Sequence, residues 1–105
     1  MKLVTALFAS VKALSEDGKC RVLVLRGGGV HGAFEVGALK AMVEKLDPKE
    51  YAYDYVSGIS IGALNGAFIS TYKKGDEALA VKKLEEFFLN NDFMDYLDVW
   101  PGIWY

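Results

Sequence analysis

Residues 53–66 read YDYVSGISIGALNG, a short β-prone run that continues through two glycines into an apolar segment of helical character. At its centre lies the pentapeptide Gly58-Ile59-Ser60-Ile61-Gly62. Glycines on both sides of a serine, at a strand-to-helix turn, permit the tight backbone of a nucleophile elbow and expose the hydroxyl to a substrate. The sequence therefore makes Ser60 the candidate nucleophile, and the N-terminus of the following helix favours negative charge beside it.

A second glycine cluster lies upstream, after another β-prone run. Residues 21–25 read RVLVL, a near-continuous aliphatic run that is typical of a strand buried on both faces of a parallel sheet. Residues 27–32 follow as GGGVHG and lead into a helical pattern. A glycine-rich loop between a strand and a helix gathers backbone N–H groups at the positive end of a helix dipole, so it can bind phosphate or stabilise an oxyanion.

The order of elements along the chain indicates the fold class. Strands are predicted over residues 21–25 and 53–57, and helices over residues 33–46, 61–72 and 77–89, the last with Asp76 as N-cap. A β-α-β-α order implies adjacent parallel strands with a right-handed crossover. We therefore predict an α/β fold, a three-layer α/β/α sandwich with a parallel sheet, of which only the first β-α-β-α part is present.

Helical periodicity also selects the apolar residues that should face the core. These are Val36, Leu39, Met42 or Val43, Leu46, Leu79 or Ala80, Leu84, Phe87 and Phe88. Asp47-Pro48 should end the first of these helices, because the residue before a proline is steered away from helical geometry.

Two parallel strands do not form a stable sheet by themselves, because their edges and faces need to be covered. We therefore expect residues 21–105 to be the N-terminal portion of a larger domain, or to need a partner chain if the short form is natural. Residues 1–20 are expected to form an amphipathic helix and a turn, with a signal peptide as the second interpretation. The aromatic segment 91–105 should pack on the core, with lipid contact as its alternative.

Composition excludes several classes of function. The 105 residues carry a net charge of −2 and no basic stripe, which argues against a nucleic-acid partner. The single cysteine, Cys20, cannot form an internal disulfide or a cysteine metal site. No apolar run reaches the ~18 residues of a membrane span. A cytoplasmic or peripheral membrane location is favoured, and secretion through an N-terminal signal peptide is the alternative.

The glycines of residues 27–32 also match the dinucleotide-binding pattern G-x-G-x-x-G. Dinucleotide binding requires an acidic residue at the end of the second strand, whereas Asp54 lies near the start of that strand. The oxyanion interpretation is preferred, because the carboxyl ends of neighbouring parallel strands bring both glycine clusters to one crevice. The only histidine, His31, precedes the serine, which does not fit the Ser, acid, His order of α/β-hydrolases. His31 is expected to shape the loop, to lie near its mouth, or to face solvent.

The motifs at residues 25–39, LRGGGVHGAFEVGAL, and at residues 56–65, VSGISIGALN, resemble the two opening motifs of the patatin-like phospholipase family. The resemblance covers residues 21 to about 70, with both motifs in the family's order and separation. It implies a lipid ester substrate, transient contact with a membrane or lipid-droplet surface, and no metal or organic cofactor.

The same resemblance implies a role for each motif residue. Ser60 would attack the acyl ester within Gly58-Ile59-Ser60-Ile61-Gly62, and an aspartate from a later Asp-Gly-Gly or Asp-Gly-Ala motif would act as base. The oxyanion would be bound by the backbone of the glycine loop, namely Gly27, Gly28, Gly29 and Val30, which continues into His31 and Gly32.

Two positions depart from the family pattern. His31 stands where the family usually has Arg or Lys, so the charge beside the loop depends on pH. No Asp-Gly-Gly or Asp-Gly-Ala follows Ser60, and the Asp-Gly at Asp17 precedes the first strand, so order alone does not make it the base. The sequence thus predicts a lipid acyl hydrolase whose aspartate lies outside the chain. The alternatives are a non-catalytic lipid-binding or interaction module and a nucleotide-binding fragment.

Overall fold

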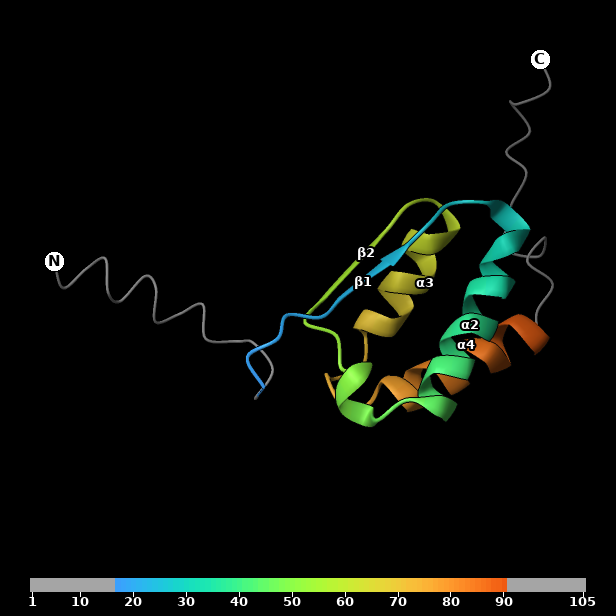
Figure 1. Ribbon diagram of the computed structural model, residues 1–105. Coiled ribbons are helices and arrows are strands. Elements are labelled where there is room, and N and C mark those ends of the chain that lie inside the picture. Colours follow the sequence, from blue (N-terminus) through green and yellow to red (C-terminus); the bar gives the residue numbers. More distant parts are fainter. Residues whose placement is uncertain (1–16, 91–105) are drawn as a thin grey trace, which may run out of the picture.

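The computed structural model describes residues 17–90 (Figure 1). The predicted N-terminal helix and the aromatic segment 91–105 therefore lie outside the described residues, except for residues 17–20. The elements follow the predicted order, with two short 3-10 helices in addition. They are β1 (Val22–Leu25), η1 (Gly29–His31), α2 (Gly32–Lys45), η2 (Pro48–Glu50), β2 (Tyr55–Gly58), α3 (Ile61–Ser70) and α4 (Glu77–Asn90).

The two strands form a parallel sheet in which Val22 pairs with Tyr55 and Leu25 pairs with Gly58. The chain leaves β1, passes through α2 and returns to β2, as a β-α-β unit requires (Figure 1). The pairing continues past the strand ends, because the Ile59 N–H donates to the Leu25 carbonyl at 3.1 Å. The α/β class predicted from the sequence is confirmed.

The helices that the structure describes cover one face of this sheet. The core cluster joins Leu23 and Leu25 of β1 to residues of the three α-helices, whereas Val24, between them in β1, is 72% exposed. The prediction that residues 21–25 are buried on both faces is therefore wrong for the described part of the chain. Within residues 17–90, β1 alternates between buried and exposed positions, because helices pack on only one of its faces.

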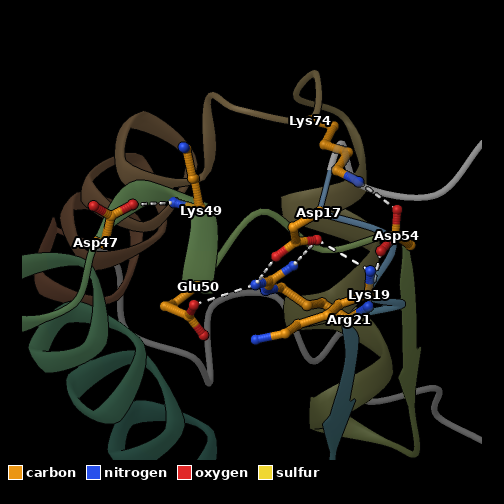
Figure 2. A network of polar contacts seen from close by, with 8 residues as sticks. All are labelled: Asp17, Lys19, Arg21, Asp47, Lys49, Glu50, Asp54 and Lys74. Carbon is orange, nitrogen blue, oxygen red and sulfur yellow. Dashed lines mark hydrogen bonds and ion pairs between the residues drawn. The ribbon is translucent and has the colours of Figure 1, made fainter.

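Helix α2 ends where the sequence predicts. Leu46 and Asp47 both have extended backbone, since the residue before Pro48 avoids helical geometry. The Asp47 carboxylate then accepts the Lys49 N–H at 2.9 Å and caps η2 (Figure 2). This turn fixes the crossover that brings the chain back to the amino end of β2.

The start of α4 depends on a residue that the sequence did not select. The helix begins directly after Asp76, as predicted, but the buried carboxylate is that of Glu77. It accepts the Gly75 N–H at 2.7 Å and the Tyr53 N–H at 3.2 Å. Glu77 therefore ties α4 to the segment that enters β2.

The predicted core positions are buried or partly buried, with two differences. Of the alternatives Leu79 and Ala80, the buried one is Ala80. Leu46 is exposed, and Val81 is buried although it was not selected. Leu46 lies past the last helical turn of α2, so its side chain leaves the apolar stripe. Helix α4 contacts both α2 and α3, so it buries a wider stripe than one partner would require, with Ala80, Val81 and Leu84 all inside (Figure 1).

A polar network closes the amino end of the sheet (Figure 2). The Arg21 guanidinium donates to both Asp17 carboxylate oxygens, at 3.2 and 2.8 Å, and to Glu50 at 3.2 Å. The Arg21 backbone N–H donates to Asp54 at 2.8 Å, and Asp54 also pairs with Lys74. The network joins the segments that precede both strands to η2 and to the segment after α3.

We expect the contribution of the Asp17–Arg21 pair to stability to depend on pH. The Arg21 guanidinium, with the Lys19 backbone N–H, holds the pKa of the Asp17 carboxyl well below its usual range. Because the folded pKa lies below the unfolded value of about 3.9, the pair stabilises the fold above that pH. The contribution is lost as the pH falls toward the folded pKa.

The substitution Asp17→Asn should therefore lower the urea midpoint at about pH 7 and have less effect at about pH 3. Because the carboxylate is solvent-exposed, about 1 M NaCl should also reduce the difference. Urea unfolding of both proteins at these pH values and salt concentrations measures this. A difference in urea midpoint between the two proteins that grows as the pH falls would contradict the stabilising role of the Asp17–Arg21 pair.

Candidate active site

Both glycine clusters lie at the carboxyl edge of the sheet. The register pairs Leu25 with Gly58, so the loops that follow β1 and β2 leave the same edge. A Cβ built on Gly27 would lie 3.3 Å from the Ile59 carbonyl oxygen and 3.3 Å from the Ser60 Cβ. The glycine loop and the serine turn are thus in direct contact, as the sequence predicts.

Ser60 has a strained backbone. Its φ is 54° and its ψ is −125°, and it is the one non-glycine residue with positive φ in the described part of the chain. An L-residue in this region costs on the order of 1–3 kcal/mol, and such strain concentrates at functional sites. Ser60 is also exposed, and α3 begins at the next residue. The elbow geometry is therefore present, whereas the nucleophilic role of Ser60 stays a prediction.

The two glycines that flank Ser60 are sterically required. A Cβ on Gly58 would lie 2.2 Å from the Gly62 carbonyl oxygen. A Cβ on Gly62 would lie 2.5 Å from the Arg26 carbonyl oxygen and 2.6 Å from that of Leu25. All of these contacts are with backbone atoms, which cannot rotate away. Glycine at position 58 therefore lets the start of α3 approach the end of β2, and glycine at position 62 lets it approach the end of β1.

The glycine loop exposes backbone donors toward this edge. Gly28 and Gly29 have φ of 152° and 57°, conformations that favour glycine. The His31 N–H donates to the Gly28 carbonyl at 3.1 Å, so η1 starts at Gly29 and runs directly into α2. Within residues 17–90, no backbone carbonyl accepts the Gly28 N–H. The first N–H groups of a helical turn likewise have no partner inside the turn, which leaves donors for an anion.

The His31 side chain hydrogen-bonds back to the backbone of the glycine loop. Its Nδ1 lies 2.8 Å from the Gly28 carbonyl oxygen. A carbonyl oxygen can only accept, so Nδ1 carries the hydrogen in this contact. Of the three interpretations left open by the sequence, loop shaping is the one that this hydrogen bond supports.

Sequence reasoning missed two residues that join α3 to α2, namely Asn65 and Glu35. Asn65 is 1% exposed, and its amide nitrogen donates to the Gly32 carbonyl at 3.2 Å and to Glu35 at 3.1 Å. The available signal was a polar residue at an inward position of an apolar helix, since Asn65 lies four residues before the buried Ile69. Asn65 belongs to the motif at residues 56–65, but the motif by itself predicts no role for it.

A cavity of about 360 Å³ opens beside the glycine loop. It is lined by a cation, an imidazole, an aromatic ring and a carboxylate, with backbone of the loop between them. These residues are Arg26, Gly27, His31, Phe34 and Glu35. Its volume lies within the range of small-molecule sites. Because Gly27 contacts Ser60, the cavity lies next to the strained serine.

The acidic residues at the amino end of the sheet do not face Ser60. Asp17 and Asp54 lie before β1 and β2, whereas Ser60 follows β2, and a four-residue strand spans about 13 Å. Both carboxylates are also engaged, Asp17 by Arg21 and Asp54 by the Arg21 N–H. Asp17-Gly18 therefore does not supply the base, and Asp54 is not placed for a dinucleotide ribose.

Within residues 17–90, no group of three or more His, Cys, Asp or Glu side chains could hold a metal ion. None of the helices in that part of the chain has the length and apolar character needed to cross a membrane.

Comparisons with known proteins bear on the family. A family model described as patatin-like phospholipase matches residues 23–104. A patatin-like phospholipase domain-containing protein of Caenorhabditis elegans is 38% identical over 84 residues, which are 75% of this chain and 7% of that protein. Neuropathy target esterases of Drosophila melanogaster and Drosophila willistoni are 53% identical over 45 residues, 43% of this chain and 3% of each relative.

The chain therefore spans less than a tenth of the length of these curated relatives. No solved structure matches it. The family model, by contrast, covers most of the chain, including both glycine clusters and every element that the structure describes after the first residue of β1. The chain belongs to the patatin-like phospholipase family.

Proposed function

We propose that the complete protein is a lipid acyl hydrolase, and that this chain supplies its nucleophile, Ser60, and its oxyanion loop, Gly27–Val30. The observation that carries the proposal is the strained backbone of the exposed Ser60 at the β2–α3 turn, in contact with Gly27. Membership of the patatin-like phospholipase family supports a lipid ester as substrate. The relatives named as phospholipase and esterase support the same reaction class.

The proposed reaction has two steps. Ser60 Oγ attacks the ester carbonyl carbon while its proton passes to a base, the aspartate that the family resemblance implies outside this chain. The carbon–oxygen bond to the alcohol breaks, and the alcohol leaves with the proton. Water then attacks the acyl group on Ser60, which releases the fatty acid and restores the serine.

Backbone donors would stabilise the tetrahedral intermediate of both steps. The open N–H groups of the glycine loop lie at the start of η1, and the Ile61 N–H lies at the start of α3. Both helical N-termini carry partial positive charge. Removal of one such donor typically raises the barrier by about 3–4 kcal/mol. The N-terminus of α3 begins directly after Ser60, so its partial positive charge would stabilise the negative charge that develops on the substrate's carbonyl oxygen.

An apolar rim around Ser60 supports contact with a lipid surface. Val30, Phe34 and Ile59 are 76%, 78% and 73% exposed, and all three belong to the glycine loop, the first turn of α2 or the serine turn. Large exposed apolar residues gathered around one site are typical of surfaces that meet a membrane or a protein. A membrane or lipid-droplet surface that contacts these side chains would present its esters to Ser60.

A fluorophosphonate probe tests the proposal, because it reacts with activated serines and leaves a phosphonyl group on Oγ. We expect mass spectrometry of peptides from the complete protein to locate the probe on Ser60. Ser57, in β2, and Ser70, at the far end of α3, are exposed serines that serve as internal controls and should stay unmodified. Labelling elsewhere would contradict the assignment. A protein that binds lipid vesicles but is never labelled would instead be the non-catalytic lipid-binding module.

A further inference from the structure

Asn65 and Glu77 are the buried polar side chains in the described part of the chain, and only Asn65 adjoins the candidate active site. The Asn65 amide nitrogen has two partners, the Gly32 carbonyl oxygen at 3.2 Å and Glu35 Oε2 at 3.1 Å. Both partners only accept hydrogen bonds, so the amide must present its nitrogen and not its oxygen to them. The side chain therefore uses its donors on two groups of α2.

Those two groups lie where the glycine loop becomes a helix. Gly32 follows the last residue of η1 and is the first residue of α2, and Glu35 lies in the first turn. A Cβ built on Gly32 would lie 2.2 Å from Ile61 Cγ1, so the start of α2 touches the residue that follows Ser60. Asn65 lies one turn further along the same helix that Ser60 precedes. It thus bridges the end of the glycine loop to the helix of the serine turn.

Asn65 is the one polar side chain among the buried residues of α3. The other buried residues of α3 are glycines and isoleucines, and burying an amide is unfavourable unless its hydrogen bonds are made. Asparagine is thus used here for its two donors. Those donors fix the position of Gly32, and through Gly32 the loop whose first glycine, Gly27, contacts Ser60.

We propose that Asn65 is a positioning residue that holds the oxyanion loop against Ser60, and that Glu35 orients its amide. The inference rests on the proposed function, because it concerns the distance between nucleophile and oxyanion donors. Catalysis depends steeply on that distance, and a displacement of about 1 Å can cost roughly 10²-fold in rate. Asn65 itself touches no substrate atom in this scheme.

A matched pair of variants at Glu35 separates the hydrogen bond from the charge. Glu35→Gln keeps an acceptor oxygen for Asn65 and removes the charge, whereas Glu35→Ala removes both. Glu35 is partly exposed, so neither change opens a large cavity in the core. The complete protein should be assayed with a soluble ester, and kcat should be calculated per serine titrated with the fluorophosphonate. This normalisation removes any loss caused by unfolded protein.

We expect Glu35→Ala to lose roughly 10-fold in kcat with little change in KM, and Glu35→Gln to lose clearly less, because it keeps the acceptor for Asn65. Equal losses in both variants would show that the charge of Glu35 matters and would overturn its orienting role. Unchanged kcat in both would overturn that role as well.

Asn65→Asp tests the amide itself with a side chain of the same shape. It replaces both donors by a carboxylate that faces the Gly32 carbonyl and Glu35, so kcat per titrated serine should fall roughly 10- to 100-fold. In the double variant Asn65→Asp, Glu35→Gln, the glutamine amide can donate to the new carboxylate, and part of the loss should be recovered. A single variant with wild-type kcat, or a double variant no better than Asn65→Asp, would overturn the proposal.

The Ser60→Ala variant distinguishes a failure of the positioning role from a failure of the proposed function. If Ser60→Ala abolishes hydrolysis and both the Glu35 and Asn65 variants keep wild-type kcat, only the positioning role is lost. If Ser60→Ala remains active, the proposed function itself is wrong, whatever the other variants do.

Discussion

Replacement of Ser60 by alanine is expected to lower kcat for ester hydrolysis by roughly 10⁴-fold or more, because no other group would take the place of the nucleophile. The fold should remain, since alanine and serine have similar steric limits at the observed φ of 54°. Hydrolysis of a soluble ester by the purified complete protein, with circular dichroism as a check on folding, measures both effects.

Two further variants sharpen this test. Ser57→Ala changes an exposed serine in β2, three residues before Ser60, and should leave kcat unchanged. Ser60→Gly should be as inactive as Ser60→Ala and should relieve backbone strain, with a gain of at most about 1 kcal/mol in unfolding free energy. An active Ser60→Ala protein would place the nucleophile elsewhere.

Replacement of Gly62 by alanine is expected to destabilise the protein on the order of 3 kcal/mol or more and to abolish activity. The new Cβ would lie 2.5 Å from the Arg26 carbonyl oxygen and 2.6 Å from the Leu25 carbonyl oxygen. Relief requires α3 to move away from the end of β1, which would also withdraw Ser60 from the glycine loop. Urea unfolding of the complete protein measures the loss of stability, and fluorophosphonate labelling measures the loss of serine reactivity.

Gly37→Ala is the matched control, because Gly37 is also a helical glycine. A Cβ at this exposed position in α2 would have no neighbour within 4 Å, so alanine should stabilise the helix by about 0.5–1 kcal/mol. Labelling of Ser60 should be unchanged. If Gly62→Ala and Gly37→Ala had the same effect on stability, the close approach of α3 to β1 would not be what requires glycine at position 62.

The sequence determined the local geometry of the candidate site, because that geometry depends on residues close together in the chain. Glycines at positions 58 and 62 predicted the turn that presents Ser60, and the structure shows steric clashes that only glycine avoids there. The aliphatic runs and the helical periods predicted the β-α-β-α order. Asp47-Pro48 predicted the end of α2.

Other features were decided only when segments distant in the chain met. Periodicity left Leu79 and Ala80 as alternatives and missed Val81, because the stripe that α4 buries depends on its contacts with both α2 and α3. The burial of β1 on one face depends on which elements lie above and below the sheet in space, and a run of aliphatic residues does not report that.

The polar partners belong to this second group as well. Asn65 and Glu35 are 30 residues apart, and Tyr53 and Glu77 are 24 apart, so no local pattern joins either pair. A buried donor or acceptor must find a partner, but its identity depends on where the packed helices place it. The sequence by itself thus determined the serine turn and the glycine loop, whereas the tertiary structure decided which side chains hold the two together.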